Sequence, residues 1–286
     1  MATEIFNAAL LMTGLGLVFA TILAVAYRFF RVEEDPRLDT LEEMLPGANC
    51  GACGQPGCRA FSEKLLEKET IPAQCTVNSP EGTQAIADFL GVSAGSIEKQ
   101  VARLHCAGGK GFVNNKAEYM GISSCRAAHF VNGGGRDCTY GCLGLADCQE
   151  ACTFGAIHMN AEGLPVVNVD LCTACSDCVT VCPLDLFKLQ PLNAPLLVQC
   201  SSPVTGKEAR AICKVACDGC SRCVRDAGDG AMEMKNGLPH ILQPQLTEQK
   251  AAFGCPTGAI QWVTKNQFSE KEKDETENLC LSGTLP

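Results

Sequence analysis

The sequence predicts an α+β chain with three kinds of part. These are an apolar N-terminal helix, a small helical domain rich in cysteine, and two tandem units of short strands and cysteine loops. Three observations predict this organisation: a long uncharged stretch near the start, 21 cysteines in clusters along the rest, and a short segment that occurs twice in the second half. A chain of 286 residues has room for two or three small domains.

The apolar stretch from Ile5 to Tyr27 contains no charged residue. As a helix it would be roughly 34 Å long, which is enough to cross the hydrocarbon core of a bilayer. A cleaved signal peptide is the alternative, but Glu4 precedes the stretch and no Lys or Arg does. Arg28 and Arg31 follow it, so the positive-inside rule predicts a single-pass anchor over residues 1–28 with the remaining chain in the cytoplasm.

The composition limits the class of function. A net charge of −9 offers no basic stripe to neutralise phosphates, which argues against a nucleic-acid partner. Cysteine at this density serves either disulfides in an oxidising compartment or thiolate-bound metal in a reducing one. A cytoplasmic location favours metal. Aromatic residues make up only 6% of the chain, so we expect metal sites to supply stability that the apolar core lacks.

Residues 33–92 are predicted to form a helical domain with one metal site. Asp35 and Pro36 begin a first helix, and the loop NCGACGQPGC leads into a second helix that opens at Cys58. Four thiolates hold a [4Fe-4S] cluster, and a helix N-terminus suits its negative charge. A zinc site is the alternative interpretation of the same four residues. The predicted ligands are Cys50, Cys53, Cys58 and Cys75.

Residues 93–198 are predicted to form a first bacterial-ferredoxin-like unit with two [4Fe-4S] clusters. Apolar spacing over residues 85–104 predicts a helix, broken near Gly91, that leads into it. The run CTACSDCVTVCP has the full ferredoxin spacing C-x2-C-x2-C-x3-C-P, and CTYGCLGLADCQEAC lies upstream. In two-cluster ferredoxins the fourth cysteine of each run binds the other cluster. The predicted sets are Cys138, Cys142, Cys148 and Cys182 for one cluster, and Cys152, Cys172, Cys175 and Cys178 for the other.

Residues 199–265 are predicted to form a second, degenerate ferredoxin-like unit. The segments AEGLPVVNVD and KNGLPHILQP mark the duplication. Four positions where a second cluster would be bound are not cysteine, so that cluster is lost; they hold Ala227, Gln245, Glu248 and Ala251. The surviving crossed set explains why the isolated motif FGCPTGAI keeps its cysteine. It comprises Cys217, Cys220, Cys223 and Cys255.

Five cysteines remain. One more cluster joining the two units would use Cys106, Cys125, Cys200 and Cys213, although a zinc site or free buried thiols would give the same count. Cys280 lies in a highly charged tail, predicted to be disordered over residues 266–286, and is expected to be an unpaired surface thiol. The chain should therefore hold at least three [4Fe-4S] clusters, with sites for a fourth and a fifth.

No self-contained substrate site is predicted, and no catalytic residue is assigned. The sequence has no G-x-G-x-x-G after a strand, and no nucleophile with a base can be assigned. The predicted chemistry is electron transfer, with the protein tuning cluster potentials through hydrogen bonds, charge and burial.

The apolar helix, then NCGACGQPGC, then YGCLGLADC with CTACSDCVTVCP resemble the B subunit of the Rnf complex, a membrane-bound ion-translocating ferredoxin:NAD+ oxidoreductase. The resemblance extends to about residue 265. It implies an oxidoreductase (translocase) subunit of the bacterial inner membrane, with soluble ferredoxin as electron donor and ion pumping in partner subunits. Carried over by motif, the family's ligands fall on the quartet from Cys50 to Cys75 and on the eight cysteines from Cys138 to Cys182. Short members of the family stop after one ferredoxin unit, whereas this chain continues.

Two other functions remain open from the sequence. One is a membrane-tethered redox sensor or cluster scaffold, which would hold labile, exposed clusters. The other is the iron-sulfur subunit of a different membrane oxidoreductase, which co-purifying partners would distinguish.

Overall fold

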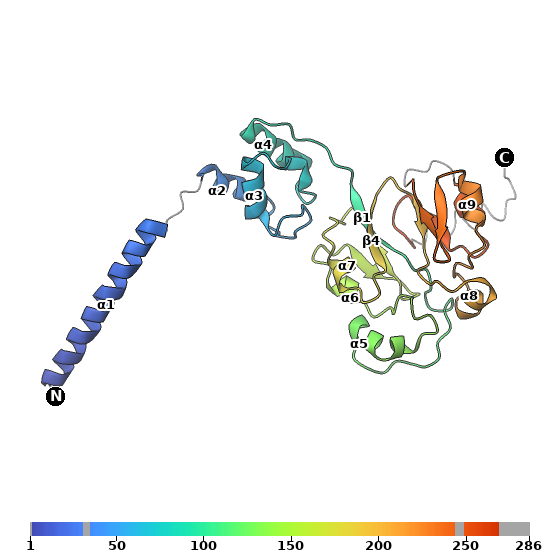
Figure 1. Cartoon of the computed structure of the whole chain (residues 1–286), viewed down its shortest axis with the longest axis horizontal. Coiled ribbons are helices and arrows are strands. Elements are labelled where there is room, and N and C mark those ends of the chain that lie inside the picture. Colours follow the sequence, from blue (N-terminus) through green and yellow to red (C-terminus); the bar gives the residue numbers. More distant parts are fainter. Residues whose placement is uncertain (1, 31–34, 244–248, 269–286) are drawn as a thin grey trace.

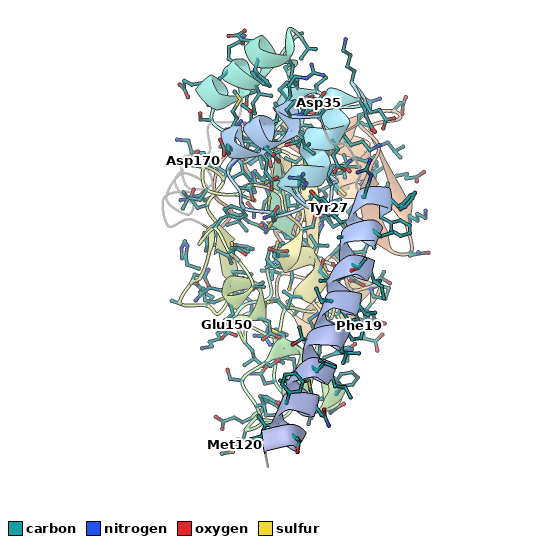
Figure 2. All side chains as sticks on the ribbon, turned by 90° about the vertical axis from the view of Figure 1, so that its left-hand side faces the viewer. Phe19, Tyr27, Asp35, Met120, Glu150 and Asp170 are labelled. Atoms are coloured by element: carbon teal, nitrogen blue, oxygen red, sulfur yellow. The ribbon has the colours of Figure 1, made fainter. Side chains whose placement is uncertain are left out.

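The structure is a computed structural model that describes residues 2–30, 35–243 and 249–268. Helix α1 (Ala2–Phe30) projects away from all other elements (Figure 1). Phe19 and Tyr27 lie along this helix (Figure 2), and both are exposed. The segment Ile5–Phe30 is long and apolar enough to span a membrane, which agrees in length and composition with the predicted anchor.

The predicted helical domain is formed by four helices around one small core. Its elements are α2 (Arg37–Met44), α3 (Cys58–Leu66), η1 (Pro72–Gln74) and α4 (Pro80–Leu90). Leu41, Phe61 and Ile86 are buried at its centre, one from each of the longer helices. Ser79 caps α4 by accepting a hydrogen bond from the backbone N–H of Gly82 at 3.0 Å. Gly91, in the left-handed region at φ +66°, ends the helix.

The prediction of a helix over residues 85–104 is wrong beyond Gly91. Residues Gln100–Leu104 form strand β1, which pairs antiparallel with β4 (Phe187–Pro191). Val101 and Leu104 are fully buried in this pairing. Their spacing also fits a helix face, and the partner strand lies far along the chain, so local periodicity could not distinguish the two structures.

Two units of like topology follow. Apart from an additional helical segment in each, both have the order strand, helix, strand, strand, helix, strand. In each unit the outer strands pair with each other and the inner strands form a hairpin. The remaining elements of the first unit are α6 (Asp147–Glu150), β2 (Ile157–Met159), β3 (Pro165–Val167) and α7 (Asp177–Val181). The second unit comprises β5 (Leu196–Val198), α9 (Arg222–Ala227), β6 (Met232–Lys235), β7 (Leu238–Ile241), α10 (Lys250–Phe253) and β8 (Ile260–Trp262).

An additional segment in each unit joins the two. The first unit contains α5 (Cys125–Phe130) and η2 (Asn132–Gly135), and the second contains α8 (Gly206–Ile212). Val113 forms a β-bridge with Cys213, and the Asn114 side chain donates a hydrogen bond to the carbonyl oxygen of Ala211 at 2.6 Å. These contacts bring the additional segments of the two units side by side.

The last described residues pack against the first unit. Gln267 is 1% exposed and bonds both backbone groups of Leu104, accepting from its N–H at 3.0 Å and donating to its carbonyl at 2.8 Å. Asn266 accepts a hydrogen bond from the backbone N–H of Val169. The tail predicted to be disordered from residue 266 is therefore ordered through Phe268. Residues 269–286, and Cys280 with them, lie outside the described residues.

Candidate metal centres

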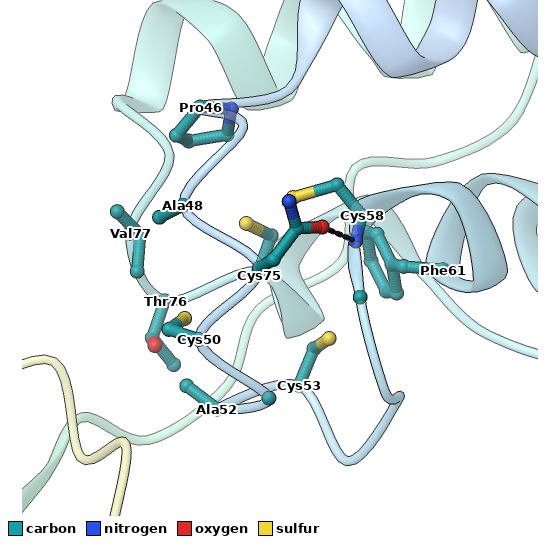
Figure 3. A pocket seen from close by; sticks show the side chains of 13 residues that line it. Pro46, Ala48, Cys50, Ala52, Cys53, Cys58, Phe61, Cys75, Thr76 and Val77 are labelled. Carbon is teal, nitrogen blue, oxygen red and sulfur yellow. Dashed lines mark hydrogen bonds between the residues drawn. The ribbon is translucent and has the colours of Figure 1, made fainter.

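The four cysteines predicted in the helical domain surround one hollow, which we call site I. Cys50, Cys53, Cys58 and Cys75 line an empty space of about 330 Å³ (Figure 3). The side-chain oxygen of Asn49 accepts a hydrogen bond from the backbone N–H of Cys58 at 2.7 Å, which ties the cysteine loop to the start of α3. Gly51 and Gly54 have φ of +72° and +81°, so the loop needs glycine to turn around the hollow.

Site II, in the first strand-and-helix unit, also has the predicted membership. It is lined by Cys152, which follows α6, by Cys172 and Cys175 in the loop before α7, and by Cys178, the second residue of α7. Its empty space is about 340 Å³. The backbone N–H of Ala156 donates to the sulfur of Cys152 at 3.2 Å.

Site III differs from the predicted set in one cysteine. Cys142, Cys148 and Cys182 line a space of about 340 Å³ as expected, but the fourth sulfur comes from Cys125, not from Cys138. Cys125 is the first residue of α5, which lies in the additional segment of this unit. The exchange shows that the nearest cysteine in sequence is not the nearest in space.

Site IV contains the displaced cysteine. Cys106, Cys138, Cys200 and Cys213 line a space of about 430 Å³ between the two units. The segment before Cys138 is held there by backbone pairing, because Asp137 donates its N–H to the carbonyl of Asn114. Cys213, from the second unit, forms a β-bridge with Val113 of the first unit. The structure thus exchanges Cys125 and Cys138 relative to the predicted quartets.

Site V is the group of Cys217, Cys220, Cys223 and Cys255 in the second unit. Burial is the main cause that raises the pKa of the Cys223 thiol, and the nearby Cys217, Cys255 and Cys220 add to the shift. Cys223 and Cys255 also pack in the same apolar core. Ala227 and Ala251, two of the four positions that lack cysteine, pack in the apolar core of this unit with Leu196 and Met232. Gln245 and Glu248 lie outside the described residues. At these two alanines, apolar packing occupies the place where a second cluster would have been held.

A [4Fe-4S] cluster fits these sites better than a single metal ion does. Within the described residues, no three or more His, Cys, Asp or Glu side chains converge closely enough to hold one ion. The 20 cysteines in that part of the chain are free thiols. Each of the four hollows is lined by four cysteines, as a cubane cluster with four thiolate ligands requires. Zinc would draw four sulfurs to one point, whereas a cubane holds them apart around its corners.

Backbone N–H groups point at several of these sulfurs. Cys106 accepts from Cys142 at 3.3 Å and from Gly108 at 3.4 Å, and Cys182 accepts from Leu186 at 3.5 Å. Such donors stabilise thiolate and cluster charge and tune the reduction potential.

Burial, in contrast to these hydrogen bonds, disfavours the thiolate form of the free cysteines. Desolvation is the main cause that raises the pKa of Cys148 and Cys178 to about 12 and of Cys217 and Cys223 to about 11. At neutral pH these groups are therefore protonated unless metal compensates the charge. A coordinating thiol is deprotonated by its metal, which provides that compensation.

The sites adjoin one another in a fixed sequence. Besides burial, the neighbouring Cys148 of site III raises the pKa of Cys178 in site II. In the same way Cys106 of site IV raises the pKa of Cys142 in site III. Cys200 of site IV likewise adds to the effect of burial in raising the pKa of Cys217 in site V. Site I meets site II through a hydrogen bond between the residues that follow Cys75 and Cys172. The thiols form one continuous series from I to V.

Sequence analysis missed two features of these sites. The Asp147 carboxylate accepts hydrogen bonds from Ser124 and from the first two backbone N–H groups of α5, and so fixes Cys125 at site III. Thr76 and Thr173 connect sites I and II. The only signal for Asp147 is its place directly before Cys148, which Asp177 shares before Cys178.

Known proteins match the chain over most of its length. A family model described as "Putative Fe-S cluster" matches residues 45–77, which enclose site I. The B subunit of an ion-translocating oxidoreductase complex from Methanosarcina acetivorans is 34% identical, over 91% of this chain and 99% of that protein. The B subunit of the Na+-translocating ferredoxin:NAD+ oxidoreductase complex from Acetobacterium woodii is also 34% identical, over 90% and 80%. The corresponding subunit of the proton-translocating complex from Clostridium ljungdahlii is 34% identical, over 92% and 95%. The chain therefore belongs to the family of B subunits of ion-translocating (Rnf) oxidoreductase complexes.

Proposed function

We propose that this chain is the membrane-anchored electron relay of an ion-translocating ferredoxin:NAD+ oxidoreductase complex, with five [4Fe-4S] clusters at sites I to V. The observation that carries the proposal is the grouping of 20 thiols into five adjoining quartets. Each cluster, when bound, accepts and releases one electron. The protein supplies the ligands, the N–H donors and the burial that set the potentials.

The proposed ligand sets follow the geometry where it departs from the sequence motifs. Site III uses Cys125 and site IV uses Cys138, while sites I, II and V keep the sets expected from the sequence. The proposed domains are accordingly an anchor, a helical one-cluster domain, a ferredoxin-like unit with two clusters, and a second such unit with one. The cluster at site IV lies between the two units and continues the relay across their junction.

The proposed route passes the sites in the order in which they adjoin. Sites I and V are its two ends, and site I belongs to the domain that follows α1. Soluble reduced ferredoxin is the proposed donor and the other subunits of the complex are the acceptors, with NAD+ reduction and ion transport in those partners. The cluster domains are proposed to lie on the cytoplasmic side, since Arg28 and Arg31 follow the apolar stretch.

Burial disfavours a scaffold that hands its clusters to other proteins. Among the described cysteines only Cys220 is exposed, and the others are buried or half-buried. A scaffold needs open, labile sites, whereas a relay needs several stable clusters in series.

The test follows the clusters by electron paramagnetic resonance in the anaerobic membrane complex. We expect reduced ferredoxin to reduce the clusters of this subunit and NAD+ to reoxidise them within the turnover time. Clusters that stay oxidised while the complex reduces NAD+ would contradict the relay. The matched control is the complex that carries Cys178→Ser, in which the signal of site II should be absent.

A further inference from the structure

Cys125 reaches site III from outside the ferredoxin-type motif, and one side chain holds it there. The Asp147 carboxylate accepts three hydrogen bonds from the start of α5: from the Ser124 hydroxyl at 3.0 Å, the Cys125 N–H at 2.8 Å and the Arg126 N–H at 3.3 Å. A carboxylate in this position satisfies backbone donors that the helix leaves unpaired.

The same residue is also joined to site III from its other side. Asp147 directly precedes Cys148 at the start of α6, and Cys148 lines the same hollow as Cys125. Burial raises the pKa of the Cys125 thiol, and hydrogen bonds from the backbone N–H groups of Asp147 and Leu145 act against that shift. Asp147 thus connects two ligands of one site that come from different segments.

The alternative ligand is held away from site III. Cys138 stands where the motif would place the first ligand, but Asp137 bonds the carbonyl of Asn114 and Asn115 bridges Arg136. These contacts keep Cys138 at site IV. Site III is complete only if α5 stays in place, and site IV is complete only if Cys138 is not drawn to site III.

We propose that Asp147 is the positioning residue that selects Cys125 as the fourth ligand of site III and thereby frees Cys138 for a separate cluster at site IV. This inference rests on the proposed cluster ligation and goes beyond it by naming the side chain that determines the ligand choice. Because the carboxylate also places a negative charge beside the site, it lowers the reduction potential of the cluster bound there.

The test compares Asp147→Ala, Asp147→Asn and the control Glu150→Ala in the full-length chain within its complex, purified without oxygen. Glu150 is an exposed carboxylate at the end of the same helix α6. Iron, labile sulfide, paramagnetic resonance signals and potentials are measured for each variant.

We expect Asp147→Ala to lose the site III signal and to lower the iron content from about 20 to about 16 per chain, at four irons per cluster. Asp147→Asn keeps an oxygen acceptor, so it should keep the cluster and raise its potential. Glu150→Ala should keep all clusters. Asp147→Ala with full iron and unchanged signals would overturn the proposal, as would an Asp147→Asn potential equal to that of the wild type. Loss of the site III signal in Glu150→Ala, matching the loss in Asp147→Ala, would also overturn the specific role.

If the Asp147→Ala protein cannot be purified, the Asp147→Asn protein still tests the proposal through its site III potential. Failure of the ligand set is separately visible, because a wild-type chain without a site III signal, or a Cys125→Ser chain that retains it, would refute the ligation itself. A site III signal lost in Cys125→Ser but unaffected by either Asp147 variant would refute only the positioning role.

Discussion

The hydroxyl of Thr76 donates a hydrogen bond of 2.7 Å to the backbone carbonyl oxygen of Thr173. Thr76 follows Cys75 at site I, and Thr173 follows Cys172 at site II, so this bond joins the walls of two hollows. It links the helical domain to the first strand-and-helix unit across 97 residues of sequence. Sites I and II are therefore held next to each other by a direct contact between their own walls.

Replacing Thr76 with Val should slow electron exchange between sites I and II. Valine keeps the shape of the side chain but removes the donor, at a cost of about 1 kcal/mol to the contact between the domains. Stopped-flow reduction with each cluster followed separately would measure the effect, and iron content should not change. Thr83→Val on α4 is the control. Equal rates in both variants would mean that this bond does not support the transfer.

Cys125→Ser and Cys138→Ser should damage different clusters. The geometry assigns Cys125 to site III and Cys138 to site IV, whereas motif spacing assigns them the other way round. Each serine variant should therefore lose the signal of one site and keep that of the other. If Cys138→Ser removed the site III signal, the motif assignment would be right and the exchange wrong.

Cys255→Ser should remove the cluster at site V and leave sites II and III intact. Cys255 packs with Cys223 in the core of the second unit, apart from the first unit. Iron content should fall by about four per chain. Unchanged iron would refute ligation of this quartet across the two segments.

Ala251→Leu should destabilise the second unit, because Ala251 is 1% exposed and its surroundings are apolar and closed. Overpacking of this kind costs about 1–3 kcal/mol. The urea concentration at which site V absorbance is lost should fall, while Ala211→Leu, at an exposed position on α8, should have little effect. An unaffected Ala251→Leu variant would show that space for the lost cluster persists.

Truncation after residue 265 should destabilise the first unit, since it removes the partner of both Leu104 backbone groups. Each buried group left unsatisfied costs about 1–3 kcal/mol. Truncation after residue 268 keeps Gln267 and serves as the control. The measurement is urea-induced loss of the site II and site III signals, and equal midpoints for the two truncations would contradict the packing role.

Motif spacing identifies the cysteines that line the hollows at sites I and II. Cys50, Cys53, Cys58 and Cys75 line one hollow, and Cys152, Cys172, Cys175 and Cys178 line the other. In each set three of the four cysteines lie close together in the chain, so a single loop brings them to the hollow. Cys125 and Cys138 could not be assigned in this way. Their places depend on the pairing of Asn114 with Asp137 and on Asp147, which are tertiary contacts that no local pattern records.

In the fold, too, elements formed by local contacts were predictable from the sequence and those formed by long-range contacts were not. The helical domain was predictable because its helices are close together in sequence, and Leu41, Phe61 and Ile86 pack in its core. The residues of strand β1 fit a helical pattern, because the i, i+3 spacing of Val101 and Leu104 is that of a helix face. In the strand these two residues lie on opposite faces, both buried, and the partner β4 lies far along the chain. Asn266 and Gln267 look like part of a polar tail, yet their amides bond backbone groups of the first unit.

The 20 described thiols are proposed to bind iron-sulfur clusters as five quartets. Iron, labile sulfide and zinc should be counted per chain in the anaerobically purified complex after correction for the other subunits. Five clusters predict about 20 irons and about 20 sulfides for this chain, with no zinc. A count of about 16 irons, or zinc in place of iron at any quartet, would contradict the account.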